Sequence, residues 1–354
     1  MTVPALSVVV PVLNGDAVLP RCFAALQAST LPRSEWELIV VDDGSTDMTA
    51  EYAATVADRV VSVADGPRGP AFARNLGVES ARGAILLFVD ADVCVHPDTL
   101  ERTRDLFAGD ATIGAAFGAY DDEPAQPDFL SQYRNLYHRY VHLQGQGDAE
   151  TFWAGCGSVR KNAFDEVGGY DAERYPRPQI EDIDLGYRLR AAGHRIVLDP
   201  TIEVVHLKRW TFRGIVKTDL FDRGLPWMKL LLTKGPDGES RTSSLNVGGT
   251  EKLKTALMGL FCAMVLCAMI LRQPLVLAAA LVPLLVIVAL NLPVYAWFAG
   301  LRGWGFALRV IPMNLLFYLI SGLAVAGALV LHILPGRRDH PQTVVESGSA
   351  GVAS

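Results

Sequence analysis

The sequence predicts an α/β domain, a Rossmann-like mixed sheet with flanking helices, followed by transmembrane helices at the C-terminal end. Two observations support this prediction. Before about residue 250, short apolar runs alternate with helical patterns and with Gly- and Asp-rich turns, which is typical of α/β domains. After residue 255, three long apolar blocks contain few charges. The net charge of −6 argues against nucleic acid as a partner.

The elements of the α/β part follow one another at short intervals. Continuous runs of β-branched and apolar residues, typical of buried strands in a parallel sheet, cover residues 7–12, 37–41, 60–63 and 84–89. Helical patterns cover residues 18–28, a stretch from about 48, and residues 70–80 and 181–192. The first run lacks a basic start and a cleavage site, so we expect a strand there and no signal peptide. The five cysteines form no C-x-x-C pair, so neither a disulfide framework nor a zinc site is expected.

The apolar blocks cover residues 257–271, 275–299 and 311–334. A membrane span needs roughly 20 predominantly apolar residues. The second and third blocks meet this length, whereas the first is short and is a candidate for a re-entrant segment. We therefore expect two to three membrane helices within residues 255–334. A buried helical hairpin in a soluble protein is the alternative.

Residues 211–254 connect the two parts. They begin with a mixture of aromatic and basic side chains that predicts an interfacial amphipathic segment, namely Phe212, Phe221 and Trp227 with Arg213, Lys217, Arg223 and Lys229. A Gly- and Ser-rich linker is expected over residues 235–249, and a disordered tail over 335–354. Lys252 and Lys254 precede the first block and favour a cytoplasmic N-terminal domain in a multi-pass plasma membrane protein, although the basic pair after the third block does not agree. Trp297 and Trp304 stand near block ends, as interfacial aromatics do.

Three acidic clusters carry most of the functional information. They are Asp42 with Asp43, Asp90 with Asp92, and the EDID sequence at residues 181–184. The first two follow predicted strands, and ligands bind beyond the carboxyl ends of strands in open α/β sheets. Burial of a carboxylate costs desolvation free energy unless a metal, a hydrogen-bond donor or a substrate interacts with it. The clusters therefore indicate a divalent cation, Mg²⁺ or Mn²⁺, that accompanies a phosphate group.

Each cluster also has a structural explanation. Asp is common in turns after strands, and acids in the first turn of a helix are favoured by the helix dipole. Asp47 is predicted to be the N-cap of the helix from about residue 48, which leaves Asp42 or Asp43 to bind a base or ribose. Three acids within residues 181–184 exceed what capping needs, so one of them is a candidate general base.

Taken together, the motifs resemble those of the family 2 glycosyltransferases, inverting enzymes of the GT-A fold, in their membrane-anchored bacterial type. The resemblance covers roughly residues 6–210 of a GT-A domain expected over residues 1–210. It rests on VVVPVLNG (8–15), VDDGSTD (41–47), GPAFARNLG (69–77), ILLFVDAD (85–92), WAGCGSVRK (153–161), FDEVGGYD (164–171) and EDIDLGYRLRAAG (181–193). Such an ordered chain of motifs is more specific than any single one.

The resemblance implies a role for each matching residue. Asp182 would be the catalytic base that deprotonates the acceptor, and Asp92 would ligate the metal on the diphosphate together with Asp90. The residues that it places on the donor side are Pro11, Asn14, Asp42, Asp43, Arg74 and Asp90.

Residues 206–210, with the sequence HLKRW, depart from the family pattern. Processive members carry Q-x-x-R-W here, and this chain keeps Arg209 and Trp210, assigned to the donor side, but has His206 in place of Gln. His206 either contacts the diphosphate or the metal, or is structural. His138 and His142 share a helix face, but no third ligand accompanies them, so no zinc site is expected.

The resemblance implies a membrane-anchored inverting glycosyltransferase of the cell envelope. Its donor would be a UDP- or GDP-linked sugar, and its acceptor a lipid or saccharide bound around residues 120–156 and 206–230. A processive polysaccharide synthase is one alternative, and a catalytically silent nucleotide-sugar-binding membrane protein is another. A dinucleotide-dependent oxidoreductase is disfavoured, because no G-x-G-x-x-G follows the first strand.

Overall fold

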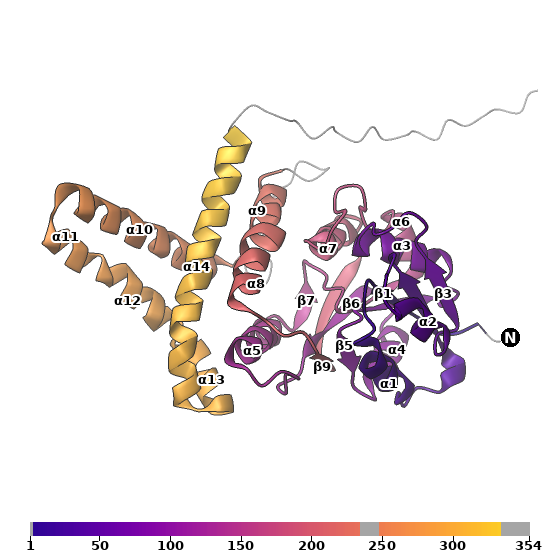
Figure 1. Cartoon of the computed structure of the whole chain (residues 1–354). Coiled ribbons are helices and arrows are strands. Elements are labelled where there is room, and N and C mark those ends of the chain that lie inside the picture. Colours follow the sequence, from indigo (N-terminus) through magenta and orange to yellow (C-terminus); the bar gives the residue numbers. More distant parts are fainter. Residues whose placement is uncertain (1–2, 234–247, 334–354) are drawn as a thin grey trace, which may run out of the picture.

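The computed structural model describes residues 3–233 and 248–333. The α/β domain lies on one side of the molecule and the C-terminal helices on the other (Figure 1). Helices α5 (Phe129–Gln144), α8 (Phe212–Lys217) and α9 (Leu225–Leu232) lie between them. The predicted tail, and residues 235–247 of the predicted linker, lie outside the described residues.

A mixed sheet forms the centre of the α/β domain. Its parallel half has the order β3-β2-β1-β4, with β1 at Leu6–Val12, β2 at Trp36–Asp42, β3 at Arg59–Ser62 and β4 at Ile85–Val89. These are the four predicted strands. β1, β2 and β4 are buried along their whole length, which explains why their sequences are continuously apolar.

The other half of the sheet begins where β8 (Cys156–Arg160) joins β4 in antiparallel orientation. It continues with β6 (Ile113–Tyr120), β9 (Arg195–His206) and β5 (Val93–Val95), and β7 (Gly147–Ala149) also pairs with β9. β5 and β9 pair with Val93 opposite His206, so this pairing brings the segment after β4 beside the end of β9.

Helices flank the sheet. Those at the predicted places are α1 (Leu19–Gln27), α2 (Thr49–Ala54), α3 (Pro70–Glu79) and α7 (Glu181–Ala191). Three more lie outside the predicted ranges, namely α4 (Thr99–Gly109), α5 (Phe129–Gln144) and α6 (Lys161–Glu166). The predicted N-cap of α2 is wrong by one residue, since Met48 occupies that position. Asp47 nevertheless accepts a hydrogen bond of 3.0 Å from the backbone N–H of Thr49, so it still stabilises the first turn.

The predicted amphipathic segment is helical. It comprises α8 (Phe212–Lys217), a π-helical stretch (Thr218–Gly224) and α9 (Leu225–Leu232). Two hydrogen bonds of 3.2 and 2.5 Å from Arg134 to the carboxylate of Asp219 attach it to α5. Phe212 and Phe221 are exposed, as an interfacial segment requires.

The C-terminal part contains α10 (Gly249–Leu271), α11 (Pro274–Ala279), α12 (Leu281–Leu290), α13 (Leu292–Arg302) and α14 (Trp304–Ile333). Within the described residues, α10 and α14 are long and apolar enough to cross a membrane, and residues 274–302 form a third candidate that is bent by 53°. The block at 257–271, expected to be too short, is thus part of a continuous candidate span, whereas the block at 275–299, expected to span, is bent. The first is continuous because the polar residues before it are also helical, and the second is broken beside Asn291.

A buried polar cluster explains the position of this break. Asn291 donates to the Ile287 carbonyl, and its Oδ1 accepts hydrogen bonds of 3.1 Å from both Lys254 Nζ and Tyr318 OH. Lys254 also bonds to Glu251 at 2.8 Å, and only 5% of it is exposed. Lys254 therefore belongs to the helix packing and not to the solvated flank in which the charge pattern placed it.

Trp297 and Trp304, both predicted to lie in the membrane interface, have different environments. Trp304 is 66% exposed, in agreement with an interfacial role. Trp297 instead packs edge-on against Tyr140 of α5, with ring centroids 5.3 Å apart, so it contributes to the contact between the two parts of the chain.

We expect Gly77→Val to destabilise the protein by about 1–3 kcal/mol, the usual cost of overpacking a core. A Cβ at Gly77 would lie 2.5 Å from Val9 Cγ1 and 2.9 Å from Val41 Cγ2, because α3 rests directly on β1 and β2. Thermal unfolding in detergent measures the effect. The control is Gly109→Val at the end of α4, where nothing lies within 4 Å of the new Cβ. Equal unfolding temperatures for the two variants would contradict the close packing of α3.

Candidate active site

Arg74 joins two of the acidic clusters. Its buried guanidinium, on α3, donates at 2.7 Å to Asp90 Oδ1 and at 3.0 Å to Glu181 Oε1. Asp90 directly follows β4, and Glu181 opens α7. The structure therefore brings the predicted metal-binding segment and the predicted catalytic helix to the same edge of the sheet.

The charges of Arg74, Asp90, Asp92 and Glu181 interact, which changes the pKa values of Asp90 and Arg74. Burial raises the pKa of Asp90, and the negative charges of Asp92 and Glu181 add to this effect, so the net shift is upward despite the neighbouring Arg74. Burial also lowers the pKa of Arg74, but Asp90, Tyr170 and Glu181 outweigh it and the net shift is upward. The guanidinium thus stays charged and offsets part of the negative charge of the cleft.

Asp92 lies beside His206, as the strand pairing requires. Nε2 of His206 is 3.4 Å from Asp92 Oδ2, and Nδ1 is 2.8 Å from Asn135 Oδ1. The imidazole stacks on Tyr120, with ring centroids 4.7 Å apart. Burial raises the pKa of Asp92, but the hydrogen bond and charge of His206, together with Lys208, outweigh it and hold this pKa below its usual value.

These residues fit a divalent cation that is completed by a ligand. No group of three or more His, Cys, Asp or Glu residues within 3–233 and 248–333 is arranged to hold a metal ion by itself. Asp90 has one oxygen engaged by Arg74, which leaves its second oxygen, the carboxylate of Asp92 and Nε2 of His206. Mg²⁺ and Mn²⁺ take few protein carboxylates and complete their shells with phosphate and water. Asn135 orients the imidazole as outer partners of metal-binding histidines do.

The two histidines of α5 belong to the core. Their rings are 4.1 Å apart at the centroids and pack around Trp153. Burial lowers the pKa of His142 to about 4 and that of His138 well below its usual value, so both are neutral. His142 Nδ1 lies 2.9 Å from the Gly118 carbonyl.

The first two strand ends form the other side of the cleft. Asp42 Oδ1 accepts from the Ser45 N–H, while the two oxygens of Asp43 accept from the N–H groups of Arg68 and Gly69 at 2.8 Å each. Asp43 therefore positions the loop that leads into α3 and Arg74. The residues expected to accompany them are also close. Asn14 Oδ1 accepts from the Thr46 N–H at 2.9 Å, and Pro11 pairs with Val41 across β1 and β2.

Asp182 lies in the first turn of α7. Its Oδ2 accepts a hydrogen bond of 3.2 Å from the Ala154 N–H. Burial and the charge of Glu181 raise the pKa of Asp182 to about 6, against the opposite effect of Arg223 and Arg74. A carboxylate with this pKa is ionised at neutral pH and basic enough to take a proton from a substrate, which suits a general base.

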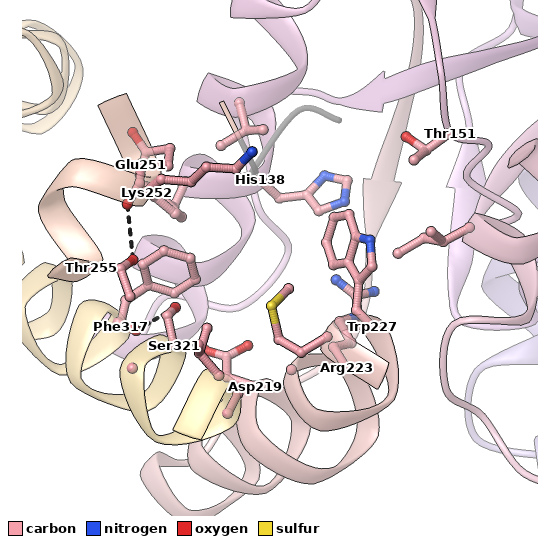
Figure 2. Close-up of a pocket in the computed structure, with 18 of the residues that line it drawn as sticks. His138, Thr151, Asp219, Arg223, Trp227, Glu251, Lys252, Thr255, Phe317 and Ser321 are labelled. Atoms are coloured by element: carbon pink, nitrogen blue, oxygen red, sulfur yellow. Dashed lines mark hydrogen bonds between the residues drawn. The ribbon is translucent and has the colours of Figure 1, made fainter. Parts of the chain in front are cut away.

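Asp182 lines a cavity of about 550 Å³ between the α/β domain and the C-terminal helices (Figure 2). Its lining includes His138 from α5, Trp227 from α9, Lys252 from α10 and Phe317 from α14. Residues 134–153 and 219–228 belong to the regions in which the acceptor pocket was expected. The contributions of α10 and α14 had no signal in the sequence.

Arg209 and Trp210, the last two predicted site residues, lie in the loop after β9 and have different environments. The Arg209 side chain is 75% exposed, and the carboxylate within 4 Å of it in the described structure is that of Asp128, at 3.7 Å. Trp210 is held against α5 by two contacts. Its backbone N–H donates a hydrogen bond to Ser131 Oγ, and the guanidinium of Arg134 lies over its ring. Neither residue is joined to the acidic clusters by a hydrogen bond or an ion pair.

Sequence reasoning missed three supporting residues. Glu181 was recognised as part of a cluster but not as the partner of Arg74. Asn135 and Tyr120, which hold His206, belong to no motif and had no detectable signal.

We expect Arg74→Met to lower stability by about 3 kcal/mol, the cost of leaving a buried charge without its partner. Glu181, whose side chain is 7% exposed, would carry most of this cost, since Asp90 is partly solvated. Thermal and denaturant unfolding in detergent measure it. The control, Arg102→Met, breaks the exposed pair with Asp98 and should cause little change. An equally small effect in both variants would show that Arg74 does not hold the site together.

Comparisons with known proteins show which family the α/β domain resembles. Residues 7–168 match the family model described as glycosyl transferase family 2. The chain is 38% identical over 112 residues to glycosyltransferase AglE of Haloferax volcanii, covering 30% of this chain and 37% of that protein. It is 31% identical over 224 residues to validoxylamine A glucosyltransferase of Streptomyces hygroscopicus subsp. limoneus, covering 54% and 49%. The chain thus spans about half or less of the length of these two relatives.

The fold is similar to that of a solved mannosyltransferase, PcManGT from Pyrobaculum calidifontis in complex with GDP-Man and Mn²⁺. The TM-score is 0.57 at 20% sequence identity, covering 92% of this chain and 87% of that one. The sheet order, the convergent acidic residues and the family match lead to one conclusion: residues 7–168 match the family 2 glycosyltransferases, and the chain has a GT-A fold followed by apolar helices.

Proposed function

We propose that the protein is a membrane-anchored inverting glycosyltransferase that moves a sugar from a nucleotide-diphosphate donor to a lipid-borne or cell-envelope acceptor. One observation carries the proposal. Arg74 connects Asp90 to the start of α7, so that the strand end expected to bind phosphate lies beside the helical turn that carries Asp182, a carboxylate of raised pKa. Ligands bind at this edge of open α/β sheets.

The donor nucleotide would lie over the ends of β1 and β2. Asp42 retains one oxygen without a hydrogen-bond partner among the described residues, so we assign it to the base or ribose. Asp43, Asn14 and Pro11 would shape this surface. GDP-Man and Mn²⁺ in the related mannosyltransferase support a GDP- or UDP-linked donor. Arg209, exposed after β9, is available to an anionic ligand, and Trp210 supports its loop.

Asp92, Asp90 and His206 would hold Mg²⁺ or Mn²⁺. When bound, the cation supplies positive charge that stabilises the diphosphate leaving group. Arg74 keeps Asp90 turned toward the cleft, and Asn135 keeps the His206 imidazole facing Asp92.

Asp182 would act as the general base. It takes the proton of an acceptor hydroxyl, whose oxygen then forms the new bond to the anomeric carbon. The bond from that carbon to the diphosphate breaks on the opposite face, which inverts the configuration. The N–H of Ala154 holds Asp182 Oδ2, and so orients the carboxylate toward the cavity that it lines.

The candidate spans α10 and α14 would anchor the enzyme in the plasma membrane. We place the GT-A domain on the cytoplasmic side, where sugar nucleotides are made. The exposed Phe212 and Phe221 would lie in the membrane interface.

We expect Asp182→Asn to reduce sugar transfer by about 10²–10⁴-fold, the usual contribution of a general base, while nucleotide binding is retained. Release of UDP or GDP from a panel of sugar nucleotides measures transfer by the detergent-solubilised protein, with membrane lipids as acceptors. Mg²⁺, Mn²⁺ or a chelator is added in parallel. The control, Asp165→Asn, removes an exposed carboxylate of α6 and should leave transfer unchanged. Nucleotide binding without release from any donor would favour a silent nucleotide-sugar-binding protein.

The rate of transfer should also depend on the ionisation of Asp182. The base must be ionised, and the pKa of Asp182 is about 6, so the rate should fall as the pH drops through that value. Single-turnover transfer measured from pH 5 to 8 tests this dependence. A flat profile across this range would assign proton removal to another group.

A further inference from the structure

The cavity beside Asp182 has an unbalanced set of charges. Arg134 and Asp219 neutralise each other through two hydrogen bonds. The side chains of Arg223 and Lys252 also line the cavity, yet no hydrogen bond or ion pair joins either side chain to another described residue. Two cations therefore face this space without a hydrogen-bond or ion-pair partner among the described residues.

The remaining carboxylates do not neutralise these cations. Glu251 lines the cavity but is bonded to Lys254 and to the hydroxyl of Tyr318. Asp182 accepts from the Ala154 N–H, and the charge of Arg223 lowers its pKa without forming an ion pair. The cavity therefore offers a place for an anionic group close to the proposed base.

The far wall of the cavity is apolar and belongs to the two candidate membrane spans. Small and larger apolar side chains of both helices line it, namely Ala256 and Gly259 of α10 with Gly322, Ala326, Val325 and Leu329 of α14. In Figure 2 Phe317 and Ser321 of α14 lie opposite Trp227 of α9 across this space. Such a wall suits a hydrocarbon chain that enters from the bilayer.

We propose that the cavity binds a sugar linked through phosphate to a lipid, and that this molecule is the acceptor. The inference rests on the proposed function. The hydrocarbon chain would lie between α10 and α14, the phosphate would pair with Arg223 and Lys252, and a sugar hydroxyl would face Asp182. Charge complementarity and the apolar wall thus select one class of lipid.

The position of Asp182 explains why a hydroxyl, and not the phosphate, is the attacking group. A phosphate oxygen is already anionic at neutral pH and needs no base, and an ionised carboxylate would repel it. A sugar hydroxyl must lose a proton, which Asp182 can accept. The phosphate therefore serves recognition, and the transferred sugar is added to a sugar that the lipid already carries.

Binding of two matched probes to the full chain in phosphatidylcholine nanodiscs tests the inference. The first is dodecyl phosphoryl-glucose and the second is dodecyl glucoside, which has the same chain and sugar without the phosphate. Glucose 1-phosphate, which lacks the chain, is the third ligand. The change of tryptophan fluorescence reports binding, since Trp153 and Trp227 line the cavity.

We expect the phosphoryl lipid to bind about tenfold or more tightly than either other ligand, as charge-assisted hydrogen bonds imply. Arg223→Gln and Lys252→Gln should each remove about tenfold of this affinity and leave dodecyl glucoside binding unchanged. Lys229→Gln, which removes an exposed charge of α9 outside the cavity lining, is the control and should bind as the wild type does. Unchanged nucleotide binding shows that the variants are folded.

Equal affinity for the phosphoryl lipid and the glucoside would overturn the inference, and so would equal affinity for glucose 1-phosphate. An equal loss in Lys229→Gln would also overturn it, because general surface charge would then explain the effect. Nucleotide release by the wild type separates this result from the proposed function. Release with an uncharged glycolipid acceptor would retain the transferase and reject the phosphate, whereas selective binding without release from any donor would reject the transferase.

Discussion

The buried guanidinium of Arg74 is the constraint on which the site depends. A buried charge in this position is tolerated because it forms ion pairs with two carboxylates, those of Asp90 and Glu181. Three elements meet there, α3, the end of β4 and the start of α7, and none of them can shift without separating an ion pair. The same contact that satisfies Arg74 therefore sets the direction of Asp90 and the position of the helix that carries Asp182.

Environment divides the aspartates of the cleft into different roles. His206 and Lys208 lower the pKa of Asp92, which keeps it ionised and suited to a cation. Burial and Glu181 raise the pKa of Asp182 to about 6, which suits proton transfer. The pKa values of these two carboxylates thus shift in opposite directions because their neighbours differ, a pattern common to acid–base enzymes and consistent with the separate roles proposed for them.

The docking of the C-terminal helices completes the site. Tyr133 and Tyr137 of α5 form one buried cluster with Phe298 and Val310 of α13 and α14. Arg302 adds hydrogen bonds to Gln132 and to the Asp122 carbonyl. Side chains of α10 and α14 line the same cavity as Asp182, so the C-terminal helices contribute a wall of the cavity besides their proposed role as an anchor.

The sequence alone determined strands β1 to β4, helices α1, α2, α3 and α7, and the three acidic clusters. These features are local, because a buried strand is continuously apolar and a helix end attracts particular residues. It also predicted that Asp90, Asp92 and Asp182 share one cleft, through the rule for strand ends and the family resemblance. The length of the first apolar helix was misjudged, since polar residues at its start are satisfied by distant partners such as Asn291.

Only the tertiary structure decided which distant side chains meet. Arg74 and Glu181 lie 107 positions apart in the chain, and His206 and Asn135 lie 71 apart. Arg223 shows the same limit, because a basic residue in an amphipathic segment indicates a membrane surface, whereas the fold turns it into the cavity. Periodicity reports whether a side chain is buried or exposed, but the partner of a charge follows from packing between elements, which has no local signature in the sequence.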